Sequence, residues 1–330
     1  MKRILTGLKP SGELTLGSLI GGIMGTIERQ NAYESFIFVP DLHAITVRQD
    51  SKLLRERIRK NVALYLACGV DPDKNIIYLQ SENLYHANLS WVLECNTYMG
   101  EASRMTQYKD KASKKENVTV GLFTYPILMA ADILLYDADY VPVGIDQKQH
   151  VELARNIAER FNKTYGDTFK IPEPLIPEMG AKIMDLQEPT KKMSKSDDSY
   201  KGVILLLDDA KTIRKKIMSA VTDSDTKVYY DPINKPGIAN LLTIYSCLKH
   251  ISISQTEEYF KEYNYGALKK EVADIVVETL SDIQKKYNEL IDSAEIDKIL
   301  DRGREITNKI AEKKVKEVFD KIGLGRRVGK

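Results

Sequence analysis

The stretch RILTGLKPSGELTLGSLIGGIMGTI, residues 3–27, decides the fold of this chain. It begins with a short apolar run, passes through a turn rich in glycine and serine, and ends in apolar residues at helical spacing. A strand, a turn and a helix in this order open a βαβ unit. The turn presents backbone N–H groups and a helix N-terminus, where an anionic phosphate can bind. It matches neither the dinucleotide fingerprint nor the P-loop, so the turn alone does not establish a nucleotide site.

The same alternation continues along the first half of the chain. Three further apolar runs, each followed by turn residues, lie at 36–39, 76–79 and 140–143. This pattern predicts an α/β fold with a Rossmann-like parallel sheet, whose ligands bind beyond the carboxyl ends of the strands. In the first helix, Gly21, Gly22 and Gly25 leave a face with little bulk. Because glycine is unfavourable in helices, its repeated use predicts close packing by a strand or a nucleotide.

The second half of the chain is predicted to be mostly helical. Pro172, Pro174 and Pro177 indicate a loop. After Asp208 the apolar residues recur at helical spacing, and a final amphipathic helix is expected to end at Gly323. A smaller, all-helical domain therefore follows the nucleotide-binding domain.

The composition is that of an ordinary globular protein, with 330 residues, 43% hydrophobic side chains and a net charge of +2. This charge does not demand nucleic acid, although local basic clusters can bind phosphates. Cys68, Cys95 and Cys247 lie far apart without a CxxC pair, which favours a reducing compartment over disulfides or a zinc site. Neither a signal peptide nor a bilayer-spanning run is evident, so we expect a soluble, cytoplasmic protein without a membrane partner.

Two later segments have the residue types that chemistry requires. Residues 191–196 read KKMSKS, and lysines and serines on a polar loop can capture a triphosphate, although most charge runs are solvated surface. Residues 124–136 read TYPILMAADILLY and contain one charged residue, Asp132. A helix would align Asp132 with Tyr125, Met129 and Tyr136 on one face. A buried carboxylate needs a partner, which is either a neighbouring element or a ligand.

Together these segments resemble the two signatures of class I aminoacyl-tRNA synthetases. Residues 192–196 spell KMSKS, and 15–18, TLGS, take the place of HIGH in a form similar to that of some bacterial tryptophanyl enzymes. Thr15 and Ser18 replace the two histidines of HIGH, which leaves hydroxyl and backbone N–H groups for the phosphates. Residues 124–136 continue the resemblance to the tryptophanyl family, which extends over nearly the whole chain. Lys9 departs from it, because the family usually has glutamine there.

The resemblance implies ATP-dependent activation of L-tryptophan to its adenylate, release of pyrophosphate and transfer to tRNA(Trp). Mg²⁺ is implied on the triphosphate, with no protein-held metal. Catalytic roles are implied for Lys111, Lys192, Lys195, Thr15 and Ser18. ATP-binding roles are implied for Lys9, Pro10, Ser11, Gly17, Ser18, Gly144, Ile145, Asp146, Ile183, Lys192, Met193, Ser194, Lys195 and Ser196. Tryptophan-binding roles are implied for Asp132, Met129, Tyr125, Gln147, Val141, Val143, His43 and Gln107, with Asp132 accepting a hydrogen bond from the indole N–H.

The resemblance also implies a division of the chain and a homodimer. Residues 1–186, with a returning C-terminal helix within 293–330, would form the Rossmann-like catalytic domain, and 187–292 a helical domain that binds the tRNA anticodon. Trp91 is interpreted as a core residue. The remaining histidines, interpreted as structural or surface residues without a role, are His86, His150 and His250.

Three alternatives stay open at this point. A tyrosyl-tRNA synthetase would share the fold and both signatures, and an aspartate can recognise a phenol as well as an indole. An adenylyltransferase that makes a small cofactor would leave the helical half unexplained. A catalytically silent relative that binds nucleotide or tRNA is disfavoured by the intact Lys192 and Lys195.

Overall fold

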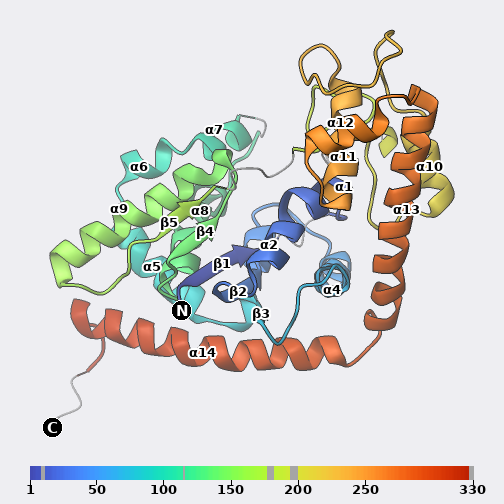
Figure 1. Cartoon of the computed structure of the whole chain (residues 1–330). Helices are drawn as coiled ribbons and strands as arrows, with labels where there is room; N and C mark the ends of the chain where they lie inside the picture. Colours follow the sequence, from blue (N-terminus) through green and yellow to red (C-terminus); the bar gives the residue numbers. More distant parts are fainter. Residues whose placement is uncertain (9–11, 114–115, 177–181, 194–199, 327–330) are drawn as a thin grey trace.

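The computed structural model describes residues 1–8, 12–113, 116–176, 182–193 and 200–326. Its centre is a parallel sheet of five strands in the order β3-β2-β1-β4-β5 (Figure 1). The strands are β1 (Arg3–Gly7), β2 (Glu34–Val39), β3 (Asn75–Leu79), β4 (Tyr140–Pro142) and β5 (Glu173–Leu175). The predicted α/β class and the four predicted strands are confirmed.

The fifth strand corrects the sequence prediction of a plain loop around Pro172 and Pro174, whereas Pro177 lies outside the described residues. β5 pairs with β4 at the edge of the sheet, and Pro174 lies opposite Val141. Proline cannot donate to a ladder of hydrogen bonds, but an edge strand needs its N–H groups on one side only. The prolines of this segment therefore led to the prediction of a loop where the structure has a short edge strand.

Helices surround the sheet and extend beyond it. Around the sheet lie α1 (Leu16–Ser18), α2 (Met24–Arg29), α3 (Asp41–Ala44), α4 (Ser51–Ala67), α5 (Tyr85–Cys95), α6 (Met99–Ser103), α7 (Thr106–Ala112), α8 (Val120–Leu134) and α9 (Lys148–Tyr165). The helical arm, at the upper right of Figure 1, consists of α10 (Ala210–Met218), α11 (Pro236–Lys249), α12 (Ile253–Phe260) and α13 (Tyr265–Leu290). The last helix, α14 (Glu295–Ile322), returns beneath the sheet and ends at Gly323 in the left-handed conformation, as predicted. No helix in these described ranges is both long and apolar enough to cross a membrane.

Alternating side chains of the sheet supply two apolar cores. Phe36 and Phe38 of β2 face one layer with α5, α8, α9 and α14. Ile37 and Val39 face the other layer, with α2 and α4, and this core continues without a break into α10–α13. The helical arm is thus joined to the sheet by buried apolar surface as well as by the chain.

The first helix is less regular than the sequence predicted. A π-helical turn, Leu19–Ile23, separates α1 from α2. Gly22 is exposed, and a Cβ built on it would meet no atom within 4 Å, while a Cβ on Gly25 would first meet the Arg29 side chain, so no strand packs closely against these two glycines. The open space at Gly22 leaves this face available for a ligand, and π-helical turns inside helices often occur at functional sites.

Candidate active site

A cavity of about 450 Å³ opens where the sheet changes direction. The chain runs from β1 to β2 on one side, whereas β4 pairs with β1 on the other side. Open parallel sheets bind ligands at such a switch point, beyond the carboxyl ends of the strands. Leu5 and Gly7 of β1, Phe38 of β2 and Val141 of β4 all line the cavity. Its position therefore follows from the strand order.

All eight residues that the resemblance assigned to the amino acid line this cavity. They are His43, Gln107, Tyr125, Met129, Asp132, Val141, Val143 and Gln147. Two residues assigned to ATP or catalysis, Lys111 and Gly144, line it as well. The lining is mostly apolar with a few polar groups, the usual composition of a site for a small organic ligand.

Asp132 is fully buried, and its carboxylate is held by three side chains. Its Oδ1 accepts from Gln80 Nε2 and His86 Nδ1, each at 2.6 Å, and its Oδ2 lies 2.8 Å from His43 Nε2. Burial alone would raise the pKa of this carboxyl, but the charge and hydrogen bonds of His43 and the hydrogen bond of His86 outweigh burial and lower the pKa to about 2. Asp132 is therefore ionised at neutral pH and can only accept hydrogen bonds at the wall of the cavity.

Tyr125 and Lys111 form the neighbouring wall. Tyr125 lies one turn of α8 before Met129, and its hydroxyl lies 3.2 Å from Nε2 of the buried His150. Burial raises the pKa of Tyr125 to about 12, so the phenol stays protonated. The Lys111 ammonium lies 4.4 Å from the centre of the Tyr125 ring, a cation–π contact at the cavity. A positive charge thus stands beside the tyrosine at the wall of the cavity.

The rim is ordered by Asp146. Its Oδ2 accepts from Gln107 Nε2 at 2.9 Å and from Gln147 Nε2 at 3.3 Å, which orients both amides beside the cavity. A Cβ on Gly144 would lie 2.6 Å from Asp146 Oδ1, so this glycine lets the carboxylate approach the backbone. Ile145 is exposed at the same rim. Gly144, Ile145 and Asp146, for which the resemblance implied ATP binding, are consecutive at this rim, next to the cavity.

The first turn forms a helix cap from the two residues that replace the histidines of HIGH. Thr15 caps α1 and is buried, and its Oγ1 accepts from the Ser18 N–H at 3.1 Å. The Ser18 hydroxyl in turn accepts from the Thr15 N–H at 3.3 Å. This capping box satisfies two backbone donors of the helix N-terminus. The hydroxyl of Thr15 therefore caps the helix, and the role toward the phosphates that the resemblance implied for it stays a prediction.

The start of the KMSKS segment lies against this turn. Met193 N–H donates to the Ile183 carbonyl at 3.0 Å, and Lys192 pairs with Met184 as a short bridge. A Cβ on Gly17 would touch Met193 Cβ at 3.5 Å and Ile183 Cβ at 3.6 Å. Thus the two signature segments meet at Gly17. Of the predicted site, Lys9, Pro10, Ser11, Ser194, Lys195 and Ser196 lie outside the described residues.

Two side chains at the site were missed by sequence reasoning, and one residue was misplaced. His86 was given no role, yet it is buried and donates to Asp132. Gln80 follows β3 directly, where ligands of parallel sheets gather, and this position was the available signal. The prediction that Trp91 belongs to the core is wrong, because it is 67% exposed on α5. Tryptophan is apolar enough to suggest burial, but position on the helix decides which way it faces.

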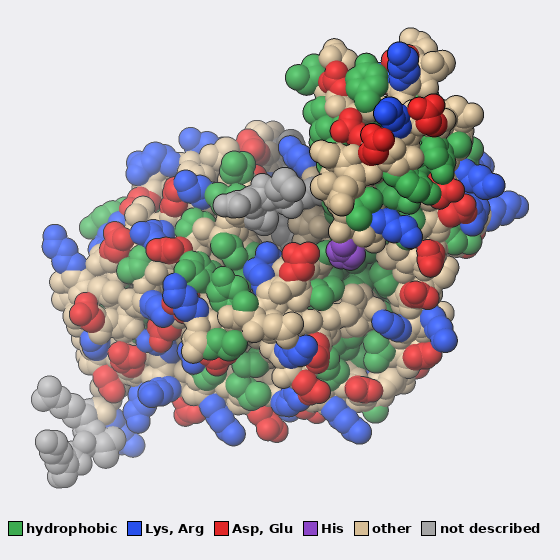
Figure 2. Space-filling model, viewed as in Figure 1, with side chains coloured by type: hydrophobic (Ala, Val, Ile, Leu, Met, Phe, Trp, Pro, Cys, Tyr) green, Lys and Arg blue, Asp and Glu red, His purple; other side chains and the backbone are tan. Residues whose placement is uncertain are grey.

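The surface around the site has no single dominant charge in the view of Figure 2. Acidic and basic side chains are interspersed over that face, with a hollow between the sheet-containing body and the helical arm. Two lysines of the basic clusters at 211–216 and 309–316 are also used internally. Lys216 pairs with Asp208 at 2.7 Å, and the buried Lys314 pairs with Asp137 at 3.0 Å. Those clusters are therefore in part structural.

A parallel sheet with a cavity at its switch point, together with the packing of Met193, from the start of the KMSKS sequence, against Gly17 of the first turn, fits a class I aminoacyl-tRNA synthetase. Residues 1–281 match the family described as tRNA synthetases class I (W and Y), and the chain belongs to this family. It is 52% identical over 324 residues to a tryptophan--tRNA ligase of Bacillus subtilis, covering 98% of each chain.

Solved structures of synthetases from this family are similar to this chain along nearly its whole length. The chain resembles tryptophanyl-tRNA synthetase from Mycoplasma pneumoniae with a TM-score of 0.90 and 37% identity, over 98% of each chain. It resembles the enzyme from Campylobacter jejuni complexed with ADP and tryptophan with a TM-score of 0.85 and 37% identity, over 98% of this chain and 100% of the other. The family expected from the sequence is confirmed, and so is the Rossmann-type α/β fold.

Proposed function

We propose that this chain is a tryptophan--tRNA ligase, which activates L-tryptophan with ATP and transfers it to tRNA(Trp). The observation that carries the proposal is the buried anion of Asp132 in the wall of an otherwise mostly apolar cavity. An indole presents a large apolar surface and one N–H donor, which matches this lining. Relatives at about half identity that are named for this activity support it.

In the proposed reaction the tryptophan carboxylate attacks the α-phosphate of ATP, the bond to pyrophosphate breaks, and the adenylate forms. Alignment of two anions and stabilisation of charge are the main tasks of the protein. Asp132 accepts from the ring N–H, Met129, Val141 and Val143 contact the ring, and Lys111 faces the phosphates. The resemblance adds Lys192 and Lys195, the latter outside the described residues.

We propose that Mg²⁺ arrives on the triphosphate as part of the substrate. Among residues that the structure describes, no group of three or more histidine, cysteine or acidic side chains could hold a metal ion. Mg²⁺ at nucleotide sites is commonly held by phosphate oxygens and water, with few protein ligands. The lysines named above would then share the neutralisation of the phosphates with the ion.

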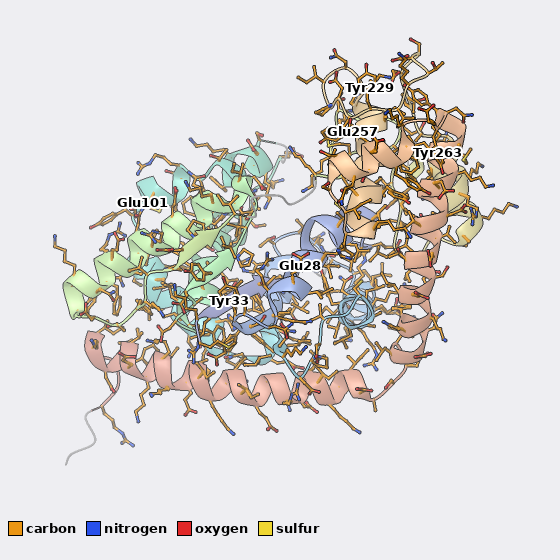
Figure 3. The ribbon with its side chains drawn as sticks, in the orientation of Figure 1. Glu28, Tyr33, Glu101, Tyr229, Glu257 and Tyr263 are labelled. Carbon is orange, nitrogen blue, oxygen red and sulfur yellow. The ribbon has the colours of Figure 1, made fainter. Side chains whose placement is uncertain are left out.

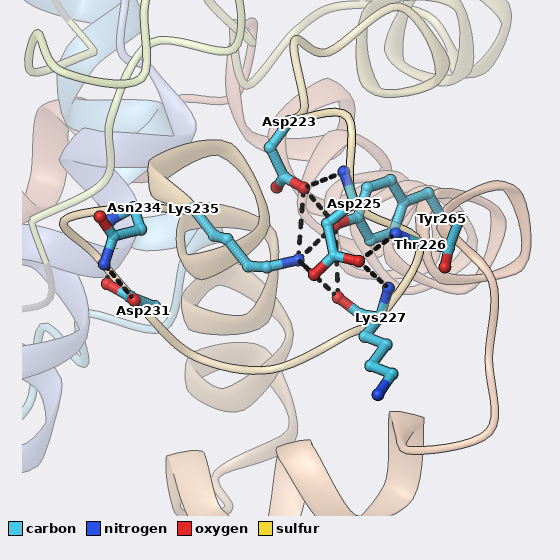
Figure 4. A network of polar contacts seen from close by, with 8 residues as sticks. All are labelled: Asp223, Asp225, Thr226, Lys227, Asp231, Asn234, Lys235 and Tyr265. Carbon is cyan, nitrogen blue, oxygen red and sulfur yellow. Dashed lines mark hydrogen bonds and ion pairs between the residues drawn. The ribbon is translucent and has the colours of Figure 1, made fainter.

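For tRNA we propose a contact on the helical arm, at the loop 221–235. Lys235 is 3% exposed at its side chain and holds this loop from inside (Figure 4). Its ammonium donates to the Lys227 carbonyl at 2.8 Å and to the Tyr265 hydroxyl at 2.7 Å, and pairs with Asp225 at 2.8 Å and Asp223 at 3.2 Å. Four partners on one cation make the loop a defined surface.

That surface presents tyrosines to solvent. Tyr229 and Tyr230 are exposed, and the Tyr230 N–H donates to Glu257 Oε1 of α12 at 2.6 Å. Figure 3 shows Tyr229 and Glu257 at the far end of the arm. Unpaired bases of RNA stack on such aromatic side chains. Tyr229→Ala should raise KM for tRNA in aminoacylation while leaving ATP–pyrophosphate exchange unchanged, and Tyr165→Ala on α9 is the control.

We also propose a homodimer that forms through the outer face of α5. Leu84 before α5, Trp91 within it, and Tyr98 and Met99 at the start of α6 are large, apolar and mostly exposed. Their spacing of about seven residues places Leu84 and Trp91 on one side of the helix. Light scattering should give a dimer mass for the wild type and a monomer mass for Trp91→Lys. Ile233→Lys on the helical arm is the control and should stay dimeric.

We propose a cytoplasmic location, supported by three free cysteines and by the role in translation. Amino-acid-dependent ATP–pyrophosphate exchange, measured with each of the common amino acids, tests the function. Exchange with tryptophan alone is the expected result. Exchange with tyrosine would make the protein a tyrosyl enzyme, and no exchange with any amino acid would favour the silent nucleotide- or tRNA-binding relative.

A further inference from the structure

The buried side of Asp132 carries a chain of hydrogen bonds that the proposed reaction does not use. Asn83 Nδ2 lies 3.0 Å from the Tyr136 hydroxyl, which lies 2.9 Å from His86 Nε2, and His86 Nδ1 lies 2.6 Å from Asp132 Oδ1. Gln80 Nε2 reaches the same Oδ1. All five side chains are buried, at 1% exposure or less. Buried polar groups of this kind are costly unless every one is satisfied.

Two backbone N–H groups fix the orientation of the Asn83 and Gln80 amides in this chain of hydrogen bonds. Asn83 Oδ1 accepts from the Tyr85 N–H at 3.1 Å, so its amide nitrogen is the end that faces Tyr136. Gln80 Oε1 accepts from the Leu42 N–H at 3.1 Å, so its amide nitrogen faces Asp132. A backbone N–H can only donate, and therefore neither amide can be flipped without losing a bond.

The positions of the protons on His86 and Tyr136 can then be assigned. The ionised Asp132 can only accept, so His86 Nδ1 donates to it; Nε2 of a neutral His86 then accepts from the Tyr136 O–H, while Asn83 donates to the Tyr136 oxygen. His86 is then the tautomer with its proton on Nδ1, and that proton is donated to Asp132 Oδ1. The Tyr136 ring is itself clamped, stacked on Phe36 at 5.2 Å between ring centres and edge-on to Tyr78 at 5.6 Å. With a neutral His86, the hydrogen bonds from Tyr136 to Asp132 therefore run in one direction.

From this geometry we infer that Asn83, Tyr136, His86 and Gln80 form a positioning relay that sets substrate specificity through Asp132. Two donors occupy Oδ1 and fix the plane of the carboxylate. Oδ2, which His43 also contacts, is thereby turned to the cavity as a committed acceptor for a ring N–H. The inference rests on the proposed function and deepens that function, because it names the residues behind the recognition of the indole.

The relay predicts which substitutions of His86 are tolerated. The amide nitrogen of asparagine can occupy the place of His86 Nδ1, whereas that of glutamine can occupy only the place of Nε2. His86→Asn should therefore keep the donor to Asp132, and His86→Gln should remove it. Tyr136→Phe removes the hydroxyl that selects the tautomer and leaves the ring packing in place.

The experiment measures ATP–pyrophosphate exchange with tryptophan and with 3-benzothienylalanine, in which sulfur replaces the ring N–H. In His86→Gln, kcat/KM for tryptophan should fall by about ten- to a hundredfold, the usual effect of a lost hydrogen bond to a charged group. The value for the sulfur analogue and KM for ATP should stay near those of the wild type. His86→Asn should recover most of the tryptophan activity, and Tyr136→Phe should lose discrimination without losing the fold.

Equal losses for tryptophan and the analogue, or equal behaviour of His86→Asn and His86→Gln, would overturn the relay. If His86→Gln does not fold, as judged by thermal unfolding, the comparison is made on Tyr136→Phe, for which unchanged discrimination has the same meaning. The exchange activity of the wild-type protein tests the proposed function separately from the relay. Absence of tryptophan-dependent exchange there would contradict the proposed function, whereas normal exchange with unchanged discrimination in the variants contradicts only the relay.

Discussion

The return of α14 to the sheet depends on one glycine, and Gly303→Ala tests this dependence. A Cβ at position 303 would lie 1.8 Å from the carbonyl oxygen of Ile77 in β3 and 3.2 Å from Tyr78 Cβ, whereas real Cβ contacts stay beyond 3.0 Å. The obstacle is backbone, so no side chain can rotate out of the way. We therefore expect α14 to move away from β3 by roughly 1 Å, with loss of contacts along a close-packed interface.

The cost can be estimated from two opposing effects. Overpacking of a core costs about 1–3 kcal/mol, and a backbone obstacle belongs at the upper end. Replacement of glycine by alanine inside a helix returns about 0.5–1 kcal/mol. The net loss is about 2 kcal/mol, which lowers Tm by roughly 4–8 °C if each kcal/mol shifts it by about 2–4 °C.

Differential scanning calorimetry of Gly303→Ala beside Gly121→Ala provides the measurement. A Cβ on Gly121, near the start of α8, would meet nothing within 4 Å, so this control gains only the helix propensity and should match or exceed the wild-type Tm. If both variants unfold at the same temperature, close contact between α14 and β3 is not what holds the last helix.

Three further predictions concern charge and connectivity. Asp132→Asn should abolish tryptophan-dependent exchange at neutral pH. Because the folded pKa of Asp132 is lowered to about 2, its ionisation contributes stability above the unfolded pKa near 3.8, and about 2 kcal/mol should be lost as pH falls toward 2. Urea unfolding should show a stability gap between wild type and Asp132→Asn that narrows between pH 5 and pH 2; a gap independent of pH would contradict the lowered pKa. Lys235→Met should cost about 2–4 kcal/mol, because Asp223 and Asp225 lose their shared cation, and circular dichroism melts compared with Lys261→Met, an exposed lysine, should reveal it. Truncation before Ile306 should expose the apolar layer against β3 and α5 and cause aggregation of the whole chain, so a monodisperse truncated protein with exchange activity would refute that role for α14.

Several features of this protein were determined by the sequence alone, because they depend on neighbours along the chain. The apolar runs and the turn residues after them predicted four of the five strands, and a parallel sheet followed from their alternation with helices. The spacing of Tyr125, Met129 and Asp132 placed them on one face of α8, since 3.6 residues make a turn. The candidate amino-acid residues were found through their resemblance to a family, and they converge on one cavity.

Only the tertiary structure decided which groups meet across the chain. Gln80, His86 and His43 reach Asp132 from separate segments, and no spacing rule relates residues 46 to 89 positions apart. Trp91 faces solvent because α8 and α14 cover the other sides of α5, and β5 exists because β4 offers an edge to pair with. Gly303 looked like any helical glycine until β3 was placed against it. The physical reason is common to all of these: local patterns specify backbone conformation and amphipathic faces, whereas the partner of a buried polar group and the space beside a glycine are set by packing between distant segments.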